Sequence, residues 1–363
     1  MATNPEVHES VDNLDTQDWP ISGLESVSAC PACGGPRRRV LYDDLHDNVF
    51  FCSPGKWALH ECLDCSSVYL DPRPTPETIH LAYRTYYTHK RAERTPTAKL
   101  RGLSYLQRAM ANGYRNWRFN ATLKPSTALG VPFAFLFPFE RAAIEHEFRH
   151  LPRTATQGRL LDVGFGDGVF LEKARDIGWD VSGIDLDPKV VENALKRGLN
   201  VYQGDLEVLA GMENEFDVIT MSHVIEHVHH PTTVLAACHR LLKPGGRLWI
   251  ETPNISSLGR SRFQSAWRGL ETPRHLVIFN RQSLCEALDR VGFADVRDAP
   301  QISPCSIVYA MSERMKNGAD PYIEAPVSAA LKVKIVAARF VEWWLKSRRE
   351  FVSITAKKAQ PSQ

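Results

Sequence analysis

The chain has 363 residues, enough for two or three domains of ordinary size. Hydrophobic residues make up 43% of it and charged residues 24%, which excludes wholesale disorder, collagen and coiled coil. The formal net charge is only +2, so charge alone indicates no nucleic acid or other polyanion as partner. Eight cysteines are too few for a disulfide scaffold in a chain of this length.

The N-terminal segment is acidic. The first 28 residues carry six acids, no Lys or Arg, and no apolar periodicity, so we expect residues 1–28 to be a disordered acidic tail. A secretory signal needs a basic start and an apolar stretch, and both are missing. The longest uncharged run, residues 125–139, is shorter than the ~20 residues that span a bilayer. We therefore expect a cytoplasmic protein, with peripheral contact at the inner membrane face as an alternative.

Four cysteines form two C-x-x-C turns 28 residues apart: Cys30, Cys33, Cys62 and Cys65. Each turn offers two thiolates, and two turns complete the tetrahedral shell of a Zn²⁺ ion. Four cysteines leave no position for water, so this zinc would be structural. We predict a zinc-ribbon-like module over residues 29–76, ending in the proline-rich run 71–76. The other cysteines and one histidine are assigned as spare ligands (Cys52, His60) or as core residues (Cys238, Cys285, Cys305).

Two helical regions are expected on either side of the central domain. Residues 77–156 predict a helical linker or lid, and between residues 84 and 124 it has ten Lys or Arg and only one acid, Glu93. Residues 313–363 predict a basic amphipathic C-terminal helix and tail, with Leu331, Ile335 and Ala338 on one face and Lys332 and Arg339 on another. These basic segments, with the aromatic run 133–139, form either a membrane-facing surface or an ordinary solvated face.

The central region alternates short β-rich runs with helix-length segments. Strands are predicted at 159–163, 181–185, 200–204, 216–222 and 247–252, and helices at 168–178, 187–197 and 231–243. This alternation predicts right-handed crossovers and a parallel sheet, hence an α/β doubly wound fold over residues 157–312. Further strands near 293–298 and 304–311 would close the sheet.

A glycine-rich loop joins the first of these strands to its helix. Gly164, Gly166 and Gly168 let the backbone approach a ligand and leave amide groups facing it. Asp185 ends the next strand, 21 residues after Gly164, where a carboxylate accepts hydrogen bonds from ribose hydroxyls. A dinucleotide fingerprint would require glycine at position 169, which is Val169. The preceding Asp162 disfavours a pyrophosphate because like charges repel.

At these motifs the sequence resembles the class I S-adenosylmethionine-dependent methyltransferases. The resemblance covers about residues 155–311 and runs through five motifs in order, starting at 162–168, 183–188, 204–206, 216–228 and 242–248. It implies a seven-stranded sheet in 3-2-1-4-5-7-6 order and S-adenosylmethionine as cofactor. The implied cofactor residues are Asp162, the three glycines, Asp185 on the ribose, Leu186 against adenine, Asp205 on the adenine amino group, Leu206, Ser222 and His223.

Methyl transfer to a hydroxyl needs a nearby base, and histidine is the usual one near neutral pH. His275, which follows the fifth strand, is the first choice, and His227, beside Glu226, is the second. His223 is a third candidate, and each could instead be a packing histidine. Arg274 could pair with an acidic acceptor group or form a surface salt bridge.

The pairing of a cysteine ribbon with this domain resembles a bacterial subgroup tied to saccharide or lipid-linked small-molecule methylation. The resemblance implies transfer to a hydroxyl, or to a carbon, of such an acceptor. Two rival functions are an RNA methyltransferase that grips nucleic acid with the ribbon and a non-catalytic zinc-ribbon interaction protein. The near-zero net charge disfavours nucleic acid, and the intact acids at 162, 185 and 205 disfavour a degenerate site. The acceptor and the oligomeric state stay open.

Overall fold

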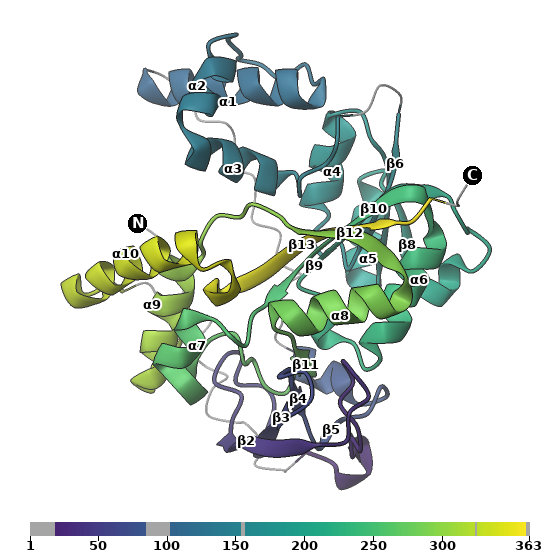
Figure 1. Ribbon diagram of the computed structural model, residues 1–363, viewed down its shortest axis with the longest axis vertical. Helices are drawn as coiled ribbons and strands as arrows, with labels where there is room; N and C mark the ends of the chain where they lie inside the picture. The colour runs from purple at the N-terminus through teal and green to yellow at the C-terminus, as the bar shows by residue number, and fades with distance from the viewer. Residues whose placement is uncertain (1–18, 85–101, 154–156, 324, 361–363) are drawn as a thin grey trace.

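The computed structural model describes residues 19–84, 102–153, 157–323 and 325–360, and its centre is a seven-stranded sheet (Figure 1). The sheet order is β12-β13-β10-β9-β6-β7-β8, which is the predicted 3-2-1-4-5-7-6 order read from the opposite edge. Its strands are β6 (Arg159–Val163), β7 (Asp180–Asp185), β8 (Asn200–Gln203), β9 (Phe216–Ser222), β10 (Leu242–Pro253), β12 (Phe293–Asp298) and β13 (Phe351–Lys358). The first five are parallel, and β13 runs antiparallel to both of its neighbours.

Helices cover both faces of this sheet. Neighbouring residues of β6 show the two faces, because Leu160 packs into one hydrophobic cluster with α4 and α5, and Leu161 into the other with α6 and α8. These helices are α4 (Val169–Asp176), α5 (Pro188–Lys196), α6 (Pro231–Leu241) and α8 (Arg281–Val291). The predicted strands and helices up to residue 298 are therefore confirmed to within a few residues, and the α/β doubly wound fold is confirmed.

The seventh strand lies elsewhere in the chain than the sequence predicts. Residues 304–311, expected as a strand, lie in helix α9 (Cys305–Lys316), which leads to α10 (Ala329–Trp344). The strand between β10 and β12 is instead β13, which pairs with β10 from Phe351 to Lys357. The expected domain end at residue 312 is therefore wrong, and residues 313–363 are not an appended helix and tail, because β13 is an interior strand.

The N-terminal module contains a four-stranded sheet in the order β11-β4-β3-β2. Three strands come from the module itself, β2 (Arg38–Leu45), β3 (Trp57–Cys62) and β4 (Val68–Leu70), but β11 (Val277–Ile278) belongs to the central domain. A smaller pair, β1 (Leu24–Glu25) with β5 (Arg73–Pro74), joins the ends of the module. Trp19 is buried and its ring lies 5.3 Å from that of Trp57. The expected tail boundary at residue 28 is therefore wrong for residues 19–28, and residues 1–18 lie outside the described part.

Helices of the expected linker 77–156 form a layer above the sheet (Figure 1). They are α1 (Leu103–Phe119), α2 (Gly130–Leu136) and α3 (Pro138–Glu147), while α7 (Leu258–Phe263) follows β10. Helices α1 and α2 approach closely, since a Cβ on Gly130 would lie 1.9 Å from the Met110 carbonyl oxygen. Most of the Lys and Arg side chains between residues 84 and 101 of this expected linker lie outside the described residues. Within the described ranges, every helix is too short or too polar to cross a bilayer.

Candidate active site

The glycine loop and the next strand end form a cradle. Gly164, Gly166 and Gly168 have φ values of +65°, +56° and +71°, a conformation that strains other residues. A side chain at position 164 would lie 2.4 Å from Val224. The Asp185 carboxylate accepts hydrogen bonds at 3.0 Å from the amides of Gly166 and Asp187. Burial raises the pKa of Asp185. The loop is thus held against the carboxylate that the sequence assigns to ribose.

Asp162 lies beneath the loop, not in the cradle. Its side chain is fully buried, and Oδ1 accepts hydrogen bonds from Arg149 and from Thr220 at 2.8 Å. Its Oδ2 atom has no partner among the described residues. Burial raises the pKa of Asp162, which Arg149 opposes. Oδ1 of Asp162 thus binds Arg149 and Thr220, and a contact of Asp162 with a cofactor stays a prediction.

The other residues predicted to contact the cofactor differ in exposure. Leu186 is 71% exposed, as an adenine-contacting side chain would be before binding. Asp205 is exposed and caps a short helical turn through the amide of Glu207. The Leu206 side chain is buried in the core, and its contact with a cofactor stays a prediction. Ser222 ends β9 opposite Glu251 and is half-buried.

A carboxylate–histidine cluster follows β9. Glu226 is fully buried and accepts hydrogen bonds from Thr252 Oγ1 at 2.9 Å and from His223 Nδ1 at 3.3 Å. Burial alone would raise the pKa of Glu226, but the surrounding histidines lower it to about 2. His223 has a left-handed φ of 54°, and its ring packs on Phe351 at 4.6 Å. Such strain at a strand end is common in functional sites.

His227 and His275 lie together, with ring centroids 4.7 Å apart. His275 is buried, its Nδ1 is 2.8 Å from the Gly269 carbonyl, and burial lowers its pKa to about 4. His227 is half-buried, with Nδ1 3.0 Å from both the Arg274 carbonyl and the Tyr83 hydroxyl. Because a carbonyl only accepts, the Arg274 contact favours a proton on Nδ1 and a lone pair on Nε2, whereas the Tyr83 hydroxyl can take either role and does not decide the tautomer. His227, His275 and Glu226 are also close enough to hold a cation together.

Arg274 serves neither of its expected roles. Its side chain is fully buried, and its two Nη atoms donate to Asp47 at 2.5 and 3.0 Å. It also donates to Glu271 and to the Ala82 carbonyl. Burial lowers the pKa of Arg274, but Asp47 and Glu271 outweigh it, and the pKa is raised. This ion pair therefore joins the N-terminal module to the loop that carries His275.

The four predicted zinc ligands converge. Cys30 and Cys65 sulfurs lie 3.8 Å apart, Cys33 and Cys62 sulfurs 3.5 Å apart, and all four within 4.8 Å of one another. Backbone amides of Gly35 and Asp64 donate to the sulfurs of Cys33 and Cys62. The spare candidates Cys52 and His60 contact other groups, the Ala82 carbonyl and the Tyr69 ring. Cys238 and Cys305 are in the core as expected, and Cys285 is only partly buried.

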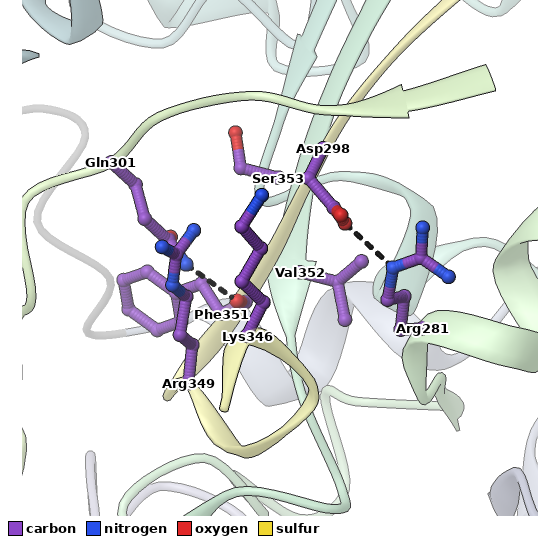
Figure 2. A pocket seen from close by; sticks show the side chains of 8 residues that line it. All are labelled: Arg281, Asp298, Gln301, Lys346, Arg349, Phe351, Val352 and Ser353. Atoms are coloured by element: carbon purple, nitrogen blue, oxygen red, sulfur yellow. Dashed lines mark hydrogen bonds and ion pairs between the residues drawn. The ribbon is translucent and has the colours of Figure 1, made fainter. Parts of the chain in front are cut away.

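Two cavities are lined by residues other than the histidines, and Phe351, which contacts His223, lines the first. The first, at the start of β13, is lined by three cations, Arg281, Lys346 and Arg349 (Figure 2). Its only acid, Asp298, pairs with Arg281 at 2.6 Å. The second, a cavity of ≈ 570 Å³ between α1, α2 and α3, is mainly apolar.

The structure adds residues that the sequence reasoning missed. Arg149 and His146, at the end of α3, hold Asp162 and Glu251, the latter at 2.8 Å. Tyr83 and Asp47 of the N-terminal region contact His227 and Arg274. No motif spacing links these four residues to the predicted site, because each lies before the predicted catalytic domain. The one signal in the sequence is the run of charged residues and histidines at 145–150.

Comparison with known proteins agrees with this geometry. A family model described as a methyltransferase domain matches residues 139–298. Residues 139–298 thus match a methyltransferase domain, and the strand order is the one implied by the resemblance to the class I S-adenosylmethionine-dependent methyltransferases.

Individual relatives share part of this domain. Over 103 residues the chain is 39% identical to the ubiquinone biosynthesis O-methyltransferase of Xanthomonas oryzae pv. oryzae, covering 26% of this chain and 43% of that one. The enzyme of the same description from Nitrosococcus oceani is 42% identical over 103 residues, covering 26% and 44%. The chain spans less than half the length of the curated relatives it matches. A solved S-adenosylmethionine-dependent methyltransferase from Archaeoglobus fulgidus is 22% identical, with a TM-score of 0.40, and the match covers 62% of this chain and 91% of that one.

Proposed function

We propose that this chain is an S-adenosylmethionine-dependent methyltransferase acting on a hydroxyl, or less readily a carbon, of a saccharide or lipid-linked small molecule. The observation that carries the proposal is the cradle in which the glycine loop faces Asp185, with a histidine cluster at the neighbouring strand end. The exposed Leu186 at the end of β7 fits a purine seated there. Hydroxyl acceptors are favoured because the relatives are named O-methyltransferases.

The chain's own residues would bind the cofactor and remove a proton from the acceptor. S-adenosylmethionine, when bound, supplies an activated methyl group. Asp185 would hold the ribose, and Leu186 would cover the purine. We assign the base to His227, because it is less buried than His275 and its Nδ1 contact leaves Nε2 able to accept a proton. His275, the first choice from the sequence, would instead hold the His227 ring in place through the contact between the two rings.

The four thiols would hold a structural zinc ion. Four sulfurs within 4.8 Å fit a closed tetrahedral site, and amide donors to two of them are typical of such turns. RNA binding gains no support from this module. Arg37 precedes β2, and Arg38 and Arg39 begin it. Each of the three is paired with an acid, which leaves little free charge for phosphate.

Cofactor binding is tested by titration calorimetry with S-adenosylmethionine. The Asp185→Asn variant should bind on the order of a hundredfold more weakly, since two charge-assisted hydrogen bonds to ribose are weakened. Asp187→Asn is the matched control, because Asn still caps α5 and the affinity should hold. If the wild-type chain shows no heat of binding, the proposed function is wrong.

Metal content is measured on the purified full-length chain. We expect one zinc ion per chain, lost in Cys62→Ser together with a cooperative melting transition of the module. Cys285→Ser, which changes a cysteine outside the cluster, should keep the zinc. Zinc absent from the wild-type protein, with its thiols reduced, would contradict the assignment.

A further inference from the structure

Helix α10 is apolar on two opposite faces. One face, formed by Leu331, Ile335 and Ala338, is buried against the core, as predicted. The opposite face carries four large side chains at helical spacing, and all four are open to solvent: Val333, Val336, Phe340 and Trp344. Phe340 and Trp344 are 67% and 69% exposed. A helix face that stays in water is normally polar, and a contiguous exposed apolar face indicates a binding surface.

The apolar face continues onto the helical layer above the sheet. Phe139, at the start of α3, packs its ring on Trp343 with centroids 4.9 Å apart. Phe139 and Leu136 are 68% and 75% exposed. The two segments are far apart in the sequence but lie side by side in the fold, as Figure 1 also shows for α3 and α10. We call the exposed side chains of residues 135–139 and the outer face of α10 the aromatic face.

Positive charge flanks the aromatic face. The only acid of α10, Glu342, is buried, whereas Lys332, Lys334 and Arg339 are exposed. The chain then passes through Lys346, Arg348 and Arg349 into β13. Lys346 and Arg349 line the cationic cavity of Figure 2, in which the one carboxylate is taken by Arg281. Within the described ranges, these six cations form no ion pair.

We propose that the aromatic face docks the protein on an anionic lipid bilayer. Exposed Trp and Phe beside Lys and Arg, on a helix too short and too basic to span, are the features of a helix lying in the membrane interface. The aromatic rings would enter the headgroup region, and the cations would face lipid phosphates. A second copy of the chain fits less well, because a two-fold contact would place these cations against one another.

Vesicle flotation tests the proposal with the full-length protein and without cofactor, so it is independent of methyl transfer. The protein should float with phosphatidylglycerol-containing vesicles at low salt, and not with pure phosphatidylcholine. Changing Phe340→Ser with Trp344→Ser should weaken binding on the order of tenfold or more. Lys332→Glu with Lys334→Glu should also weaken it, and high salt should do the same. Leu195→Ser, at a leucine 54% exposed on α5, is the matched control and should bind as wild type.

Tryptophan fluorescence gives a second readout, which detects bilayer contact directly in the wild-type protein. Vesicles with brominated acyl chains should quench the tryptophan fluorescence of the wild type, and replacing both Trp343 and Trp344 by Phe should remove most of that quenching. The proposal is overturned if the wild type stays unbound at low salt, or if the serine variants bind as well as the control. It is also overturned if light scattering shows that the serine changes convert a dimer to a monomer, which would assign the aromatic face to a second copy.

Discussion

His275 is buried between His227 and Glu271, so its protonation is linked to folding. Burial holds its pKa at about 4, below the ordinary value near 6.5. As pH falls below 6.5, the unfolded chain takes up a proton that the folded chain refuses. Stability present above that pH is thus lost as pH falls toward 4, by about 3 kcal/mol from this group.

The measurement is urea unfolding at pH 7 and pH 4. His275→Gln should lose less unfolding free energy between these values than the wild type. The exposed His80 provides the comparison, and His80→Gln should keep the wild-type slope. Equal losses in His275→Gln and the wild type would show that His275 is not held neutral.

Individual residues were predictable where one strand end determines their place. Asp185 and the three glycines lie in the expected cradle because the loop and the strand are adjacent in sequence. The ion pairs of Asp162 and Arg274 were not predicted, since the partners Arg149 and Asp47 come from other parts of the chain. A sequence pattern shows which acid follows a strand, but not which distant cation has already neutralised it.

Among the elements, β13 is the one whose removal is most informative. It lies between β10 and β12 and buries Val352, Ile354 and Ala356. A chain ending at Arg349 would leave two interior strand edges unpaired. It should therefore lose its cooperative thermal transition, followed by circular dichroism. A chain ending at Gln360, which keeps β13, should melt like the full chain; cooperative melting of the shorter chain would contradict the strand assignment.

The strands of the central sheet up to residue 298 were predictable because β6, β7 and β9 are each followed by a helix of ordinary length before the next strand. The error at 304–311 has a local cause, since Cys305 begins a run containing Ile307, Val308 and Tyr309 that suits a strand equally well. Periodicity cannot separate a short buried helix from a strand. The helices α9 and α10 are inserted before the last strand, and only the pairing of β13 with β10 reveals it.

At the scale of the whole molecule, the N-terminal module and the central domain share a sheet and a buried ion pair. Strand β11 pairs with β4, and Arg274 pairs with Asp47 at 2.5 Å. The sequence separated these parts at residue 76, because the prolines there mark a boundary but do not show which surfaces meet. From outside the predicted catalytic domain, Tyr83 therefore contacts His227, and Asp47 contacts Arg274, the residue before His275.

The Asp47–Arg274 pair should couple the two parts energetically. Arg274→Met leaves Asp47 buried without its cation, which should cost about 3–5 kcal/mol of unfolding free energy. Adding Asp47→Asn should recover part of that loss. The exposed pair Arg37–Asp64 is the control, and Arg37→Met should cost below about 1 kcal/mol. Similar costs for Arg274→Met and Arg37→Met would show that the buried pair does not join the module to the domain.

A crystal structure of the full chain with S-adenosylhomocysteine would show most directly where the nucleoside binds. We expect both ribose hydroxyls within hydrogen-bond distance of the Asp185 carboxylate, and the purine ring against Leu186. The sulfur should lie on the side of the sheet edge where His223 and His227 follow β9. A ligand bound at another edge, or an empty cradle at saturating ligand, would contradict the account.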